Sequence, residues 1–387
     1  MTTPTAPPPG PPRPITITAA ASAPLEPDLI PPDTGPAQPA AAKPPTVLTR
    51  GTLPSWVPWV ICAASAATGL GLGGLLGLHR ALAVAFAAAL VVTALPMLSW
   101  RVEGARRAKD RLVTVVVTIA FSLALLPLLS LLMTVTSNGL ARLDWEFLSQ
   151  DMLGVIGPGG GALHAVVGTL LITGAAAVIS VPIGVMCAVY LVEYGRGRLA
   201  RAVTLLVDVM TGIPSIVAGL FAFALFAIFL GPGVRFGIGG AVALSVLMVP
   251  IVVRSVEEML KLVPNELREA SYALGVPKWR TVLRVVLRMA APGIATGVTI
   301  AVSRVIGETA PLLIIAGSTT RVNADLFDGR MSSLPIFTYY SYSIPGARPE
   351  FGIDRAWAAA LTLFILVMAL NLLARLISRF FKFSTSR

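Results

Sequence analysis

The sequence predicts an all-α polytopic membrane protein with eight transmembrane helices. Its 387 residues are 55% hydrophobic and 13% charged, whereas a soluble globular chain usually carries about 25% charged residues. From residue 57 onward, apolar stretches recur that reach the roughly 20 residues a helix needs to cross the hydrocarbon core. Runs of this length lack the alternation of a transmembrane barrel, so helices are expected. The composition excludes an ordinary soluble enzyme.

Residues 1–56 differ in composition from the rest of the chain. They hold sixteen of the 31 prolines and almost no aromatic residues. Because proline lacks an amide donor, and because so few apolar side chains could offset the entropy of ordering, we expect a disordered tail. Its PxxP-like spacing leaves open a docking role for a partner.

Eight apolar segments follow the tail. The first two, 57–78 and 81–100, are joined by His79 and Arg80 alone, and they predict an added hairpin that occupies residues 57–104. The other six predict a core over residues 105–387. They cover 112–135, 164–190, 205–230, 238–256, 291–316 and 356–378.

Basic residues in the connecting segments predict the orientation. With eight crossings, the tail, the loops 101–111, 193–204 and 257–290, and the C-terminus lie on one side, and these loops are rich in arginine and lysine. The opposite loops, 136–163 and 317–355, hold at least as many acidic as basic residues. By the positive-inside rule, both termini are expected in the cytoplasm of a plasma-membrane protein. The net charge of +11 then reports topology, and no nucleic-acid partner is expected.

The segment 257–290 is too long for a simple connection. Pro264 suits a first helical turn, and Glu266 and Glu269 follow near the positive end of the helix dipole. Gly275 can end this helix in a left-handed conformation, and a second, basic helix can cover 278–289. The first helix has one mildly apolar face, formed by Leu267, Ala270, Ser271 and Leu274. A docking surface for a partner and an amphipathic helix lying on lipid explain these residues equally well.

Part of this segment resembles a known loop. Glu269-Ala270-Ser271, followed three residues later by Gly275, is similar to the EAA loop of ABC importer permeases. In that family the loop is a coupling helix that docks on the ATPase subunit. The pattern departs in its second half, where Leu287-Arg288 stands in place of the usual Leu-Pro. The resemblance implies that the docking residues are Glu266, Glu269, Ala270, Ser271, Leu274 and Gly275.

Further runs resemble the phosphate importer permeases, and PstA-type subunits in particular. They are Gly159-Gly160-Gly161, Gly168-Thr169-Leu170, the run 212–220 and, most specifically, the run 304–313. The resemblance implies a type I ABC importer permease core of six helices. It also implies a complex in membrane lipid that imports inorganic phosphate. In it, this chain pairs with a PstC-like permease, two PstB-like ATPases that bind ATP and magnesium lie underneath, and an extracytoplasmic phosphate-binding protein delivers the phosphate. The glycine-rich segment 157–161 lacks the Lys-Ser/Thr of a nucleotide loop, so no cofactor is expected on this chain.

Charged residues inside spans cost about 2.5–3.5 kcal/mol each unless they have a partner or a water-lined path. Arg304 and Glu308 are four residues apart on one predicted helix and so share a face. They form either a self-neutralising pair or a pathway site, in which the planar Arg304 fork binds phosphate oxygens and Glu308 holds that fork. Thr309 adds a hydroxyl beside them.

Two more charges lie near the cytoplasmic side. Arg254 either extends to the lipid headgroups or provides a second guanidinium along the phosphate pathway, as the family resemblance implies. Asp208 is expected to neutralise a nearby basic residue. No group of side chains has the spacing of a metal site.

Three other functions are alternatives to a phosphate permease. A permease for another oxyanion, such as molybdate or sulfate, has a similar core, but the run 304–313 argues against it by resemblance. A membrane scaffold or sensor would use the proline-rich tail and the basic loops to recruit partners. An intramembrane enzyme lacks support, because no paired carboxylates, Ser/His pair or HExxH motif lies within the spans.

Overall fold

The computed structural model describes residues 53, 54, 56–75 and 80–383, so nearly all of the predicted tail lies outside the described residues. Every regular element in this part of the chain is a helix. The chain divides into two units, residues 1–117 and 118–387. Each is described by itself.

The first unit contains the two helices predicted as a hairpin, α1 (Val57–Leu75) and α2 (Arg80–Val102). They pack against each other. Their described apolar parts, Val57–Gly69 and Phe86–Val102, are shorter than a full span. A third helix, α3 (Ala105–Leu140), begins in this unit and continues into the second.

A buried carboxylate organises the turn between α2 and α3. Glu103 accepts hydrogen bonds from Ser99 Oγ at 2.7 Å, from Arg111 Nε and Nη2 at 2.7 and 2.9 Å, and from the amide of Leu53 at 2.8 Å. The adjacent Gly104 has a φ of +97°, which a glycine adopts without strain. The Arg111 hydrogen bonds are the main reason that the pKa of Glu103 falls to about 2.

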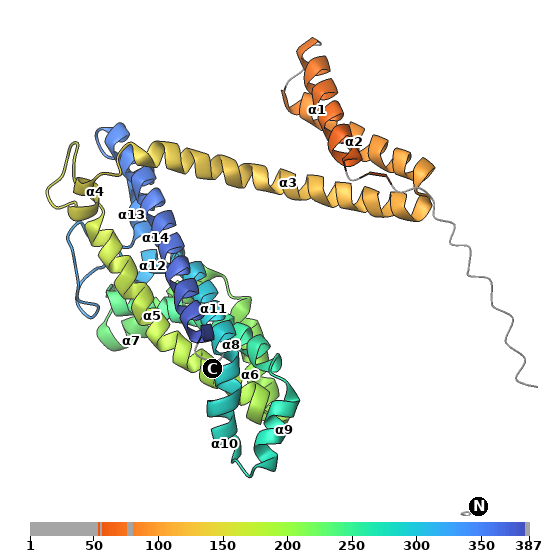
Figure 1. Cartoon of the computed structure of the whole chain (residues 1–387). Helices are drawn as coiled ribbons and strands as arrows, with labels where there is room; N and C mark the ends of the chain where they lie inside the picture. The colour runs from red at the N-terminus through yellow and green to blue at the C-terminus, as the bar shows by residue number, and fades with distance from the viewer. Residues whose placement is uncertain (1–52, 55, 76–79, 384–387) are drawn as a thin grey trace, which may run out of the picture. The chain divides into compact units, whose positions relative to one another are not determined.

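The second unit is built around α8 (Gly237–Lys261), whose apolar stretch is 61% buried. Its main neighbour is α5 (Leu163–Val189), where Gly184 allows close packing because a Cβ there would lie 2.6 Å from Val252 Cγ1. Against this pair pack α11 (Leu287–Val305) and α7 (Ser215–Leu230), while α14 (Pro349–Phe383) packs on α11. In Figure 1, α9 (Asn265–Ala273) lies at one end of the unit, and α4 (Trp145–Ser149) and α13 (Leu334–Ser343) lie at the other.

Two predicted spans are interrupted. The span predicted over 205–230 is two helices, α6 (Gly197–Thr211) and α7, which meet at 109°. Pro214 explains the break, because it lacks an amide donor and disfavours a helical Ile213. The bounds predicted for the span over 291–316 are also wrong. The spanning helix starts earlier, with α10 (Lys278–Thr281), and continues through the π-helical η2 (Val282–Val286) and α11. It ends at Val305, and residues 306–309 separate it from the short helix α12 (Ala310–Ile315).

Fewer candidate spans are found in the described residues than the eight predicted, because the described apolar parts of α1 and α2 are too short to qualify. Five helices are long and apolar enough to cross a membrane, or six if the bent pair α6–α7 counts as one span. The structure confirms an all-helical polytopic membrane protein.

The Glu103 turn gives a testable pH dependence. Since its pKa falls from 4.5 to about 2, ionised Glu103 stabilises the turn fully above pH 4.5, and this contribution is lost as the pH falls towards 2. Hydrogen exchange, corrected for intrinsic rates, should show the Leu53 amide losing protection over that window. Glu103→Ala removes the acceptor and should expose the amide at every pH, and equal protection of both proteins at neutral pH would contradict this account.

Candidate functional site

The two runs that carry the sharpest resemblance lie against each other. The run 212–220 spans the α6–α7 break and the first turns of α7, and the run 304–313 spans the α11–α12 break. Helices α7 and α12 pack together at Gly219, where a Cβ would lie 2.6 Å from Pro311 Cα. Only a glycine allows this approach, so the two interrupted spans meet at one place.

Arg304 is exposed and is the second-last residue of α11, whereas Glu308 and Thr309 lie partly exposed in the break after it. The predicted pairing of Arg304 with Glu308 is wrong, because the helix ends between them. No ion pair within 4 Å joins the two side chains in the part of the chain described. The end of α11 is instead fixed by Ser303, whose hydroxyl donates to Asn371 Oδ1 on α14 at 2.6 Å.

Arg254 belongs to a separate cluster on α8. Its guanidinium donates to Asp208 on α6 and to Glu257 Oε2, the latter at 2.9 Å. The other carboxylate oxygen of Glu257, Oε1, pairs with Lys261 at 2.7 Å. The expectation that Asp208 neutralises a basic residue is confirmed. None of the contacts among described residues joins Arg254 to Arg304.

The predicted loop helix is confirmed as α9, which ends at a corner where Gly275 has a φ of +73°. Leu274, beside that glycine, is 83% exposed. Most of the predicted docking residues are exposed: Glu266, Glu269, Ala270, Leu274 and Gly275. Ser271 is an exception, because it is buried and its hydroxyl bonds to Thr281 Oγ1 at 2.8 Å, which ties α9 to α10.

An ion pair that the sequence did not reveal connects this loop to the core. Arg268 on α9 donates through Nε and Nη2 to Glu193 Oε1, at 3.0 and 2.8 Å. Glu193 lies in η1 (Tyr190–Tyr194), the π-helical end of α5, and its side chain is 5% exposed. Arg268 also donates to the carbonyls of Leu260 and Val263, at 3.0 and 2.6 Å. One guanidinium therefore fastens α9 to the ends of both α5 and α8.

A lysine strengthens the same junction. Lys278, the first residue of α10, donates to the carbonyl of Glu193, and its ammonium lies 4.9 Å from the centre of the Tyr194 ring. Both arms of the loop therefore converge on the end of α5. The only sequence signal was an acidic residue directly after an apolar span, 75 positions from its partner.

These features agree with comparisons to known proteins. A family model described as the binding-protein-dependent transport system inner membrane component matches residues 180–387. The match includes α8, the 257–290 loop and both helix breaks. The chain therefore belongs to this family of transporter membrane components.

Curated relatives narrow the family. The phosphate transport system permease protein PstA 1 of Mycobacterium tuberculosis (strain ATCC 25618 / H37Rv) is 47% identical over 277 residues, which cover 70% of this chain and 88% of the relative. The PstA protein of Pasteurella multocida (strain Pm70) is 36% identical over 273 residues, 70% of this chain and 95% of the relative. Within the family, the chain belongs to the PstA permeases, the non-catalytic membrane components predicted by the resemblance.

Solved structures show the same fold. A bacterial ABC transporter that imports alginate matches with a TM-score of 0.52 and 15% identity, covering 70% of this chain and 96% of that one. A structure of the alginate transporter in complex with a pentasaccharide-bound periplasmic protein matches with a TM-score of 0.53 and 13% identity, covering 72% and 96%. The chain thus has the fold of the membrane component of an ABC importer.

The contact at Gly219 can be tested by alanine substitution. Gly219→Ala places a Cβ 2.6 Å from Pro311 Cα, so the backbones must separate, at an expected cost of about 1–3 kcal/mol. Thermal unfolding of the purified protein should show a lower midpoint. Gly174→Ala, on α5, is the matched control because nothing lies within 4 Å of its Cβ. Equal midpoints for the two variants would contradict the close packing.

Proposed function

We propose that this chain is one of two membrane subunits of an ATP-driven importer of inorganic phosphate. The observation that carries the proposal is the meeting of two interrupted spans beside Arg304, in a chain 47% identical to a phosphate transport system permease protein. The partners are a PstC-like permease, two PstB-like ATPases that hold ATP and magnesium, and an extracytoplasmic phosphate-binding protein. This chain holds no cofactor of its own.

In the proposed topology, eight helices cross the plasma membrane and both termini are cytoplasmic. The hairpin α1–α2 over 57–104 adds two spans to a six-helix core over 105–387, and the tail 1–56 precedes them. The positive-inside rule supports this orientation, because the basic segment 257–290 lies at the end of the second unit opposite α4 and α13 (Figure 1).

The proposed route passes the α11–α12 break. Non-helical backbone at membrane depth is tolerated where it is buried in protein or lines a water-filled cavity, and broken helices form the substrate sites of many transporters. Arg304 is exposed and forms no ion pair with any described residue, so its fork is free for a phosphate oxyanion. Glu308 and Thr309 follow in the break and supply an acceptor and a hydroxyl to a protonated phosphate oxygen.

Arg254 forms a second step nearer the cytoplasm. Asp208 and Glu257 neutralise it in this structure, so a passing phosphate has to compete with two carboxylates. Such a site holds the anion weakly and releases it readily.

The α9 corner is proposed to dock on an ATPase. Leu274 presents an apolar side chain at the exposed corner, and Glu266, Glu269, Ala270 and Gly275 are also exposed on α9 and its corner. A push on this corner reaches α5 and α8 through Arg268 and reaches α10 through Ser271. The connected helices then rock, and the route at Arg304 opens alternately to the delivery side and to the cytoplasm.

The first test replaces the pathway arginine. Arg304→Ala should lower phosphate uptake at least about tenfold, because a charge-assisted double hydrogen bond is lost, while the complex still assembles. Uptake of radiolabelled phosphate into proteoliposomes measures this, with sulfate and molybdate as competitors that separate the alternative oxyanion permeases. Arg375→Ala, an exposed arginine on α14, is the control. Normal uptake by the Arg304 variant would refute the pathway role.

The second test alters the corner. Gly275→Val should uncouple ATP hydrolysis from uptake, because a β-branched residue is strained at a φ of +73°. Gly275→Asn should retain coupling, since asparagine tolerates that conformation and the Cβ meets nothing within 4 Å. Phosphate transported per ATP hydrolysed is the measurement, and equal ratios for both variants would exclude a docking role that depends on this conformation.

A further inference from the structure

A cavity of about 190 Å³ lies beside the start of α14, and Figure 1 places that end of α14 opposite α9. It is formed where the segment 157–160 meets the first turns of α14. Apart from the glycine-rich segment 157–161, none of the residues discussed above belongs to it. Its lining is Arg142, Pro158, Gly159, Phe351, Asp354 and Arg355.

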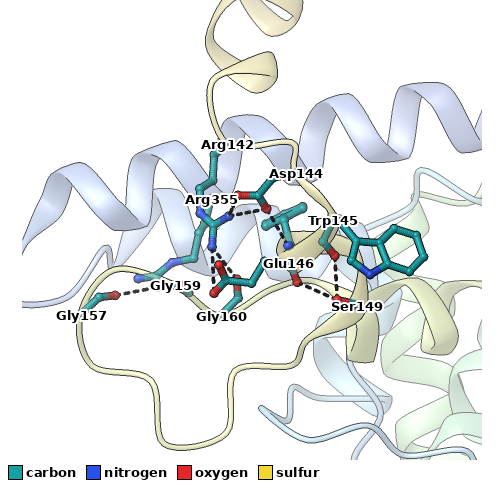
Figure 2. Close-up of polar contacts among 10 residues, drawn as sticks. Arg142, Asp144, Trp145, Glu146, Ser149, Gly157, Gly159, Gly160 and Arg355 are labelled. Carbon is teal, nitrogen blue, oxygen red and sulfur yellow. Dashed lines mark hydrogen bonds and ion pairs between the residues drawn. The ribbon is translucent and has the colours of Figure 1, made fainter.

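Arg355 is 8% exposed and is held from one side. Its Nη1 donates to the carbonyls of Gly157 and Gly159, at 3.1 and 3.2 Å. Figure 2 shows these contacts fixing the guanidinium against the glycine-rich segment. Its Nε and Nη2 bond to no other residue in the described part of the chain, and no carboxylate there lies within 4 Å of it. The edge of the fork that can grip two oxygens is therefore free.

The second arginine of the cavity is already neutralised. Arg142 Nη1 contacts both oxygens of Asp144 at 2.6 Å, and its Nη2 donates to the carbonyl of Gly160 at 2.9 Å. Asp144 in turn accepts from the amide of Phe147 at 2.8 Å and so caps α4. That amide, together with Arg142, lowers the pKa of Asp144, so this carboxylate stays ionised and paired. Arg142 Nη2 also lies 3.9 Å from Glu146 Oε1, so both carboxylates of this segment pair with Arg142 and neither pairs with Arg355.

A guanidinium with this little exposure costs free energy unless an anion neutralises it. Carbonyl oxygens satisfy one nitrogen but bring no negative charge. The free Nε and Nη2 are parallel donors that match two oxygens of a tetrahedral oxyanion. The carboxylate of Asp354 lines the same cavity and repels an anion without protons, but it can accept a hydrogen bond from one that carries a hydroxyl.

We propose that Arg355 binds a hydrogen phosphate ion in this cavity, with Asp354 accepting from its hydroxyl. The site is on α14, whereas Arg304 is on α11, so it goes beyond the route proposed above. Its location on the side that receives phosphate rests on the proposed topology. In that position it is a receiving site that an ion occupies before it reaches the helix breaks.

The test measures inorganic phosphate binding to the purified complex, without ATP or binding protein, in a phosphorus-free detergent. Equilibrium dialysis with radiolabelled phosphate should show binding that Arg355→Lys weakens about tenfold or more, because lysine keeps the charge but loses the fork. Measured in an Arg304→Ala background, which removes the proposed route site, the remaining binding should still weaken with Arg355→Lys and stay unchanged with Arg375→Ala, an exposed arginine on α14. Unchanged affinity in Arg355→Lys would overturn the proposal.

A second variant keeps the test independent of any folding defect in Arg355→Lys. Asp354 is exposed, and Asp354→Asn should let sulfate compete with phosphate, whereas sulfate should compete poorly in the parent protein. Equal competition in both would overturn the role of Asp354 and the selection of a protonated anion. A lipid headgroup carries the same phosphate chemistry. Phospholipid that copurifies with the parent protein and not with Arg355→Lys, without binding of free phosphate, would also overturn the proposal.

Discussion

The backbone of a membrane-spanning segment has no water to bond to, and this constraint governs the second unit. The chain breaks two helices within its apolar core, and each break frees amides and carbonyls that need partners. Gly219 and Pro311 bring the broken segments into backbone contact, while Gly212, Pro214 and Gly307 within the breaks remain exposed in the single chain. The same breaks leave Arg304 at a helix end without a carboxylate beside it among the described residues. The proposed anion route therefore passes the place where the two interrupted spans meet.

The 257–290 loop depends on a second constraint, the cost of burying an ion pair. Arg268 and Glu193 are almost withdrawn from water, and a buried ion pair is stable only when further hydrogen bonds offset the lost hydration. The carbonyls of Leu260 and Val263 provide those bonds. The loop is thus joined to the core by directional bonds and not only by apolar contact. Directional bonds resist sliding, which suits the proposed role of this loop in transmitting force from an ATPase.

Local patterns predicted the features that depend on nearby residues. The helix over 264–274 and its corner at Gly275 were found because proline, acidic residues and glycine mark them in order. The breaks at 212–214 and 306–309 were missed, because apolar composition continues through them and hydropathy does not register a bend. The pairing of Arg304 with Glu308 failed for the same reason, since the four-residue rule holds only on an intact helix. Contacts between distant residues, such as Arg268 with Glu193, left no local trace.

Arg268 serves α5, α8 and its own helix with one planar group, and this has an evolutionary consequence. A lysine has a single point charge and could replace one of those contacts but not all of them. A change at either Arg268 or Glu193 alone strands a desolvated charge. Single substitutions at either position are therefore disfavoured. The two residues are expected to be retained or replaced together across lineages, as a covarying pair.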